Sequence, residues 1–274
     1  MVKLILRGMA VGMTETVPGI SGSTVAMIVG IYERLIYSLS ILTTNKRKEA
    51  IPFLLTFGVG MVLGFGCSIF IIKFLLETYR TPTFLFFVGI IVGFLPYLWH
   101  DTIKHAQSKL RVKHYVIMLF FFGVVVGSQV LGSFHFIDWN HLTFFDYVFF
   151  IIAGFIASTA LVLPGISGAL ILTILGLYEA MTASLVALNW PILFAVGSGI
   201  LLGVLLTSKL IRYLLKHYTS ETYSAMVGLV SGSIFAILNE LDGVINNQVI
   251  IASLITFVGG IVLIFLLQQT QKKL

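Results

Sequence analysis

The stretches "TETVPGISGSTVAMIVGIYE", residues 14–33, and "ALVLPGISGALILTILGLYE", residues 160–179, are two copies of one pattern. In each copy a Pro-Gly pair interrupts an apolar segment, and a Tyr-Glu pair closes it. Proline removes a backbone donor, and glycine adopts backbone conformations that other residues avoid. We therefore expect one helix to stop at each Pro-Gly pair and another to start at the following Ser-Gly. The two pairs are Pro18 with Gly19, and Pro164 with Gly165.

The rest of the chain is strongly apolar. Of its 274 residues 58% are hydrophobic and 10% are charged, and the mean hydropathy is +1.04. A water-soluble domain carries far more charge. A bilayer-spanning helix needs about 20 apolar residues, and six segments qualify: 50–76, 82–99, 114–133, 191–215, 222–239 and 248–268. The sequence predicts an all-α polytopic membrane protein, and the net charge of +6 does not indicate nucleic acid binding.

The N-terminal segment superficially resembles a signal peptide, because Lys3 and Arg7 precede an apolar stretch. Glu15, Pro18 and the later copy of the motif argue against a cleaved leader. The single Cys67 excludes an intrachain disulfide framework.

The repeat extends beyond the two motifs. Residues 146 positions apart match around the motifs (Pro18 and Pro164), and residues 139 positions apart match further on (Gly60 and Gly199). We expect two halves, 1–134 and 143–274, within one membrane domain. A duplicated apolar pattern with interrupted helices is typical of secondary transporters.

Charge predicts the orientation of these halves. The segment 147–178 has no charge and would span about 48 Å as one helix, well beyond a core of about 30 Å. We therefore predict re-entrant hairpins at 8–42 and 146–187, each followed by three transmembrane helices. This arrangement places the basic loops 45–49 and 100–113 and both termini in the cytoplasm, as the positive-inside rule requires. The equivalent loops 187–190 and 239–247 are uncharged and acidic, which predicts an inverted-topology repeat.

The restarted helices are candidate phosphate sites. Free backbone N–H groups at a helix start carry the positive end of the helix dipole and bind anions. We expect such groups near Ser21, Gly22 and Ser23 in one half and near Ser167 and Gly168 in the other, with the Thr24 hydroxyl nearby. The alternative is that Pro-Gly makes a tight turn and the small residues permit close packing.

Glu15 is a candidate for proton or ion coupling. A carboxylate inside a membrane is costly and usually functional, and burial favours its protonated form, so that it could bind and release a proton. Thr14 and Thr16 flank it, and the second motif has only apolar residues there. The alternative is a structural ion pair with Arg7.

Other matched positions have more than one interpretation. Glu33 and Glu179 end the two motifs as caps or interface markers. Lys73 and Arg212 are matched cations that could bind phosphate or extend to lipid headgroups. The repeated glycine pairs (Gly60/Gly64, Gly89/Gly93, Gly199/Gly203, Gly228/Gly232) are predicted helix-packing contacts. The histidines fall in predicted loops or at membrane interfaces, so we predict no metal site and no cofactor.

These motifs resemble those of the polyprenyl-phosphate transporter family, and the resemblance covers essentially the whole chain. It is carried by "GMTETVPGISGSTVAMIVGIYERLI" and "ALVLPGISGALILTILGLYEAM". Glu15 stands where Asn or Asp is common in that family, and Ser23 where a second glycine is common. The resemblance implies a flippase of the bacterial cytoplasmic membrane that returns undecaprenyl phosphate from the outer to the inner leaflet. It would thereby recycle the lipid carrier for cell-wall polymers such as peptidoglycan.

Two other functions are weighed against this one. A transporter of a small soluble anion or metabolite could use the same hairpins. An intramembrane enzyme is disfavoured because no histidine lies in a predicted span to activate Ser21 or Ser167. The sequence leaves open proton or sodium coupling and a homodimer.

Overall fold

The computed structural model describes residues 1–17, 19–106, 110–130, 142–239, 241 and 246–272, and the regular structure in these ranges is helical. The first six helices are α1 (Val2–Thr14), α2 (Gly22–Ile28), α3 (Tyr32–Ile41), α4 (Arg47–Thr78), α5 (Arg80–His105) and α6 (Val112–Val130). The next six are α7 (Phe144–Val162), α8 (Gly168–Ile174), α9 (Tyr178–Val186), α10 (Trp190–His217), α11 (Thr219–Asn239) and α12 (Asn247–Lys272).

Within the described residues, seven helices are long and apolar enough to cross a membrane: α4, α5, α6, α7, α10, α11 and α12. They carry many exposed apolar side chains, such as Val62 and Phe70 on α4, which are 72% and 80% exposed. Such a surface suits lipid rather than water. The chain is therefore a multi-pass, all-helical membrane protein.

The six predicted spans correspond to α4, α5, α6, α10, α11 and α12, and these helices begin or end beyond the predicted spans. Each helix extends beyond the apolar run; α5, for example, continues from residue 99 to His105. Helical hydrogen bonding continues through polar residues at the membrane interface, so hydropathy alone does not mark the helix end. Residues 131–133 of the third predicted span lie outside the described residues. The remaining long helix, α7, is the first arm of the second predicted hairpin.

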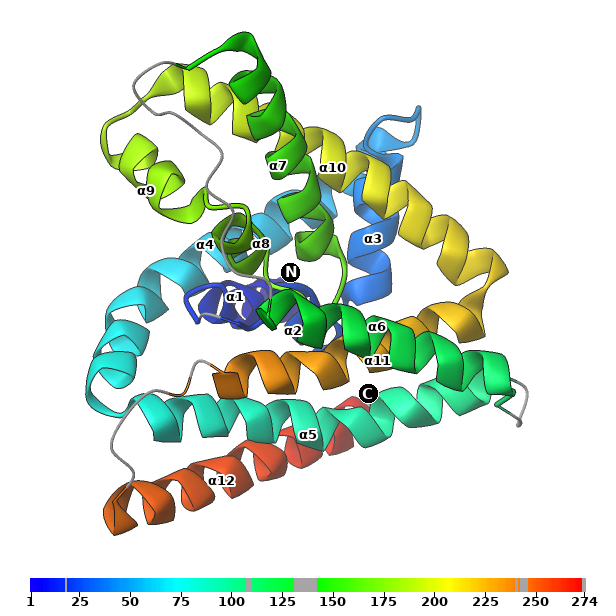
Figure 1. Ribbon diagram of the computed structural model, residues 1–274. Coiled ribbons are helices and arrows are strands. Elements are labelled where there is room, and N and C mark those ends of the chain that lie inside the picture. Colours follow the sequence, from blue (N-terminus) through cyan, green and yellow to red (C-terminus); the bar gives the residue numbers. More distant parts are fainter. Residues whose placement is uncertain (18, 107–109, 131–141, 240, 242–245, 273–274) are drawn as a thin grey trace.

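The long helices pack as neighbours in a fixed order. Helices α12, α5, α11 and α6 lie side by side across the lower part of Figure 1, and α7 crosses α10 in the upper part. Helix α1 packs along α4, and α3 lies against both α10 and α4. The largest apolar core forms where α1, α2, α3, α4, α5 and α11 converge.

The predicted glycine contacts are present. A Cβ added at Gly60 would overlap the backbone of Ile5, and one at Gly199 would overlap that of Ile151. Gly89 and Gly228 abut Phe257 and Met118 in the same way. Without side chains at these positions the helix backbones approach closely. Ile151 lies 146 positions after Ile5, and Phe257 lies 139 after Met118, so both halves use equivalent contacts.

Both motifs break the chain where predicted. Helix α1 ends at Thr14 and α2 starts at Gly22, while α7 ends at Val162 and α8 starts at Gly168. Gly19 and Gly165 have φ angles of +79° and +90°, which favour glycine. Each Ser-Gly therefore starts a new helix.

Each predicted hairpin contains three helices rather than the expected two. Helices α2 and α8 end after one or two turns, because Gly30 and Gly176 adopt φ angles of +70° and +69°. The N–H of Ile31 donates to the Ala26 carbonyl (2.9 Å), and that of Leu177 donates to the Leu172 carbonyl (2.8 Å). These bonds close a helix C-terminus around a glycine. This second break was not predicted, because a glycine inside an apolar run is also compatible with a continuous helix.

Candidate functional site

The two breaks contact each other in the protein interior. The Ser23 hydroxyl donates to the Leu163 carbonyl (2.9 Å) and lies 2.6 Å from the Ser21 hydroxyl oxygen. The N–H of Gly165 donates to the Thr24 hydroxyl oxygen (2.9 Å). All three hydroxyl residues are buried, so these bonds form away from solvent. Pro164 is also buried in this contact region, whereas Pro18 lies outside the described residues.

Tyr32 extends the contact between the breaks. It starts α3 and is 4% exposed, and its hydroxyl donates to the Val162 carbonyl (3.0 Å). Tyr32 was not predicted to be a site residue, although the matched Tyr-Glu pairs were a signal that could have indicated it. Its partner is a main-chain carbonyl, which has no sequence signature.

Glu15 lies at the start of α2. The Gly22 N–H donates a hydrogen bond to its carboxylate, and a Cβ at Gly22 would overlap the same carboxylate. An anionic side chain at this point satisfies a helix N–H group that would otherwise have no partner. The alternative, an ion pair with Arg7, is not among the ion pairs of the described residues. Glu15 therefore lies where phosphate was predicted to bind.

The start of α8 has different surroundings. Leu161 occupies the position equivalent to Glu15, and a Cβ at Gly168 would lie 3.6 Å from its side chain. Ser167 is buried, but unlike Ser23 it makes no side-chain hydrogen bond within the described residues. The first break is thus polar and the second is largely apolar.

Thr14 and Thr16 satisfy the end of their own helix. The Thr14 hydroxyl donates to the Val11 carbonyl (2.8 Å), and the Thr16 hydroxyl donates to the Met13 carbonyl (2.6 Å). Their oxygens retain acceptor capacity.

The contacts of the two matched cations lie outside the breaks. Lys73 pairs with Glu77 one turn later on α4 (3.8 Å), and both side chains are exposed. Arg212 donates to the Ser40 hydroxyl (3.2 Å), and its guanidinium lies 4.5 Å from the centre of the Tyr37 ring. Arg212 therefore joins α10 to α3, whereas Lys73 contacts its own helix.

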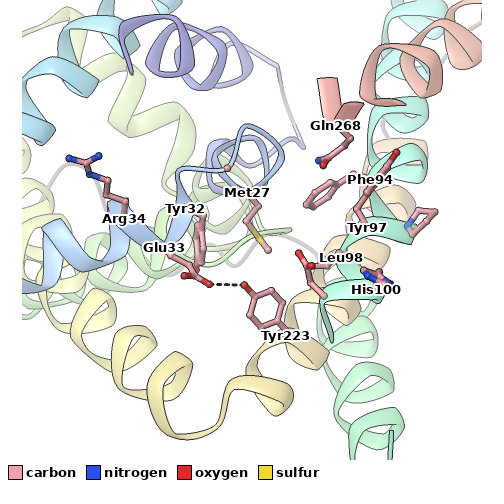
Figure 2. Close-up of a pocket in the computed structure, with 13 residues that line it drawn as sticks. Met27, Tyr32, Glu33, Arg34, Phe94, Tyr97, Leu98, His100, Tyr223 and Gln268 are labelled. Atoms are coloured by element: carbon pink, nitrogen blue, oxygen red, sulfur yellow. Dashed lines mark hydrogen bonds between the residues drawn. The ribbon is translucent and has the colours of Figure 1, made fainter. Parts of the chain in front are cut away.

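A polar cavity of about 730 Å³ lies beside Tyr32 (Figure 2). Glu33 and Arg34 from α3 line one side, and His100 and Asp101 from α5 also line it. The Tyr223 hydroxyl on α11 donates to the Glu33 carboxylate (2.7 Å), as the dashed line in Figure 2 shows. Tyr32 lines this cavity and also contacts the second break, so the cavity adjoins the contact between the breaks.

The matched carboxylate Glu179 is exposed at the start of α9. It borders a shallow recess with Tyr178 and Thr182. In the part of the chain that the structure describes, no three His, Cys, Asp or Glu side chains gather to hold a metal ion. The contact between the breaks thus offers hydroxyls, backbone N–H groups and the Glu15 carboxylate, a set suited to binding an anion and a proton.

Comparison with known proteins agrees with this chemistry. Residues 11–251 match the undecaprenyl phosphate translocase-like family. A polyprenyl-phosphate transporter of Staphylococcus aureus (strain NCTC 8325 / PS 47) is 34% identical over 94% of this chain and 93% of its own. Another polyprenyl-phosphate transporter, from Vibrio cholerae serotype O1, is 30% identical over 84% of this chain and 75% of its own. No solved structure matches the chain.

Proposed function

Because this chain belongs to the undecaprenyl phosphate translocase-like family, we propose that it transports undecaprenyl phosphate across the bacterial cytoplasmic membrane. The net movement is from the outer to the inner leaflet, which recycles the carrier for cell-wall polymers. The single observation that carries this proposal is the direct contact between the two buried breaks, Ser23 with Leu163 and Thr24 with Gly165. Polar groups from both halves are thereby brought together inside an apolar protein, where one headgroup could exchange hydrogen bonds with them.

The proposal includes an inverted repeat with re-entrant hairpins and cytoplasmic termini. The equivalent glycine contacts support two related halves, as do the near-identical φ angles of Gly30 and Gly176. Irregular backbone at membrane depth is tolerated only where protein or a watery cavity covers it, and the breaks meet this condition. Inverted halves would then expose the same site alternately to the two leaflets.

The lipid substrate suits this architecture physically. The isoprenoid tail stays in hydrocarbon, where each buried carbon unit contributes about 0.8 kcal/mol. Only the headgroup faces a large barrier, of order tens of kcal/mol for a bare charge in a low-dielectric medium. Hydroxyls and helix N–H groups at the breaks would lower that barrier, and the polar cavity beside Tyr32 would give the headgroup access to water.

Glu15 supplies a coupling mechanism in this proposal. The carboxylate and an incoming phosphate compete for the same Gly22 N–H. Protonation of Glu15 makes it neutral, weakens this hydrogen bond and leaves the N–H to the phosphate. One proton would then enter the site with each headgroup.

Reconstitution tests the function directly. Purified protein in proteoliposomes is expected to exchange fluorescent undecaprenyl phosphate between leaflets, and Ser21→Ala and Arg212→Ala are compared with the intact protein. A parallel assay of inorganic phosphate uptake distinguishes a soluble-anion transporter. No lipid exchange by the intact protein would remove the proposed function.

A further inference from the structure

Two apolar grooves lead from the protein surface to the breaks. The first groove, about 250 Å³, is enclosed by α1, α2, α4, α5 and α12, with Ile72, Phe86, Phe87 and Ile90 on its walls. Its rim includes Met13 and Leu263, which are exposed, and its inner end includes the buried Thr14 and Thr24. This groove therefore ends at the polar contact between the breaks.

The second groove, about 390 Å³, lies among α6, α10 and α11 and is also lined by Leu163. Ile211, Ala225, Met226 and Leu229 form its walls. These four residues stand 139 positions after Ile72, Phe86, Phe87 and Ile90. The two grooves are therefore equivalent surfaces of the two halves.

We propose that these two grooves bind the isoprenoid tail of the transported lipid, one on each side of headgroup transfer. This inference rests on the proposed function and on its inverted repeat, which would open the two grooves toward opposite leaflets. The tail would lie in the first groove at one leaflet and in the second groove at the other.

Continuity with the headgroup site identifies the occupant. Thr24, at the inner end of the first groove, accepts a hydrogen bond from the Gly165 N–H. The Leu163 carbonyl, at the second groove, accepts a hydrogen bond from the Ser23 hydroxyl. Each groove thus joins an apolar wall to the polar contact, as one lipid with a phosphate end requires. A soluble anion has no apolar part to fill such a groove.

Of the four equivalent wall pairs, Phe86 and Ala225 differ most in size. Phe86 in the first groove is replaced by Ala225 in the second, and the second groove is larger. Ala225→Phe therefore places in the second groove a side chain that the first already holds. Overpacking is expected to weaken tail binding there about tenfold.

Photo-cross-linking tests the inference without any substitution. Undecaprenyl phosphate with a diazirine on its tail is added to proteoliposomes, and labelled peptides are identified by mass spectrometry. We expect labels on residues of the two grooves, such as Ile90 and Met226, above those on lipid-facing Val62. Equal labelling of Val62, or equal groove labelling by a diazirine phosphatidylcholine, would overturn the tail assignment.

A matched pair of variants provides the second measurement. Ala225→Phe is expected to slow exchange of undecaprenyl phosphate about tenfold and that of farnesyl phosphate much less. Val62→Phe, on the exposed face of α4, is the control for added bulk. Monodispersity and thermal stability establish that the variant is folded, and the labelling result on the unmodified protein holds if it is not. If Ala225→Phe exchanges lipid as fast as Val62→Phe, the tail assignment of the grooves is refuted and the proposed function still holds. The proposed function itself fails only if the unmodified protein exchanges no lipid.

Discussion

The break before α2 and the break before α8 share a backbone conformation but differ in their surroundings. Ser21 and Ser167 have φ and ψ angles of −95° and 125°, and of −91° and 130°. Glu15 contacts the first helix start, whereas Leu161 contacts the second. The shared Pro-Gly-Ile-Ser-Gly sequence determines the path of the chain, and neighbouring residues determine what each break can bind.

Because of this difference, the two halves contribute different chemical groups to the site. The first break contributes side chains, namely the hydroxyls of Ser21, Ser23 and Thr24 and the Glu15 carboxylate. The second contributes main-chain groups, the Leu163 carbonyl and the Gly165 N–H. In our proposal the first break therefore handles protons, and both breaks contact the headgroup.

The largest difference is expected at the two turn glycines. A Cβ at Gly165 would overlap the backbone of Leu229 and Val230, but one at Gly19 would lie 3.4 Å from its nearest neighbour, Ile237. Gly19→Ala should cost roughly 1–2 kcal/mol of stability for its backbone conformation. Gly165→Ala should cost more, roughly 3 kcal/mol or above, because fixed backbone atoms must also move. Thermal unfolding in detergent measures both, and equal shifts would contradict the observed packing.

Glu15→Gln makes the first break as uncharged as the second. The substituted amide stays neutral, so it can neither release a proton nor compete with the phosphate as a carboxylate does, and exchange should fall about tenfold or more. The intact protein should also show a pH dependence between about pH 5 and 9 that the variant lacks. Leu161→Met is the control at the equivalent position, and full transport by Glu15→Gln at every pH would exclude the coupling role.

Thr24→Val removes the hydrogen bond between the breaks while keeping the side-chain shape. The buried Gly165 N–H then has no acceptor at this position, at a cost of roughly 1–3 kcal/mol. Denaturation in detergent measures the loss, and faster hydrogen exchange at Gly165 localises it. Thr173→Val, on the exposed face of α8, removes only a bond to its own helix and serves as the control. A similar stability loss in both variants would argue against the contact.

Ser23→Ala and Ser167→Ala give the smallest expected contrast in stability. Ser23 donates to Leu163, so its loss should cost about 1 kcal/mol. Ser167 makes no side-chain bond among the described residues, so its replacement should be close to neutral. If both serines bind the headgroup, both variants should nevertheless exchange lipid more slowly. A neutral Ser23→Ala would mean that its bond contributes little.

Some of the site followed from local signals. The positions of both breaks and the starts of α2 and α8 were predicted correctly, because proline and glycine act on the backbone within a few residues. The short lengths of α2 and α8 were not predicted, since Gly30 and Gly176 fit an uninterrupted apolar helix equally well. Lys73 and Arg212 match in sequence, yet Arg212 contacts α3 and Lys73 contacts α4.

The sequence by itself determined that this protein lies in a membrane and that two of its apolar segments are broken. These properties depend on side-chain hydropathy and on backbone preferences of neighbouring residues. Only the tertiary structure decided that the breaks touch, that Glu15 lies at Gly22, and that Tyr32 reaches Val162. Those contacts join residues that pack together after the chain folds, and several use main-chain atoms that every residue possesses.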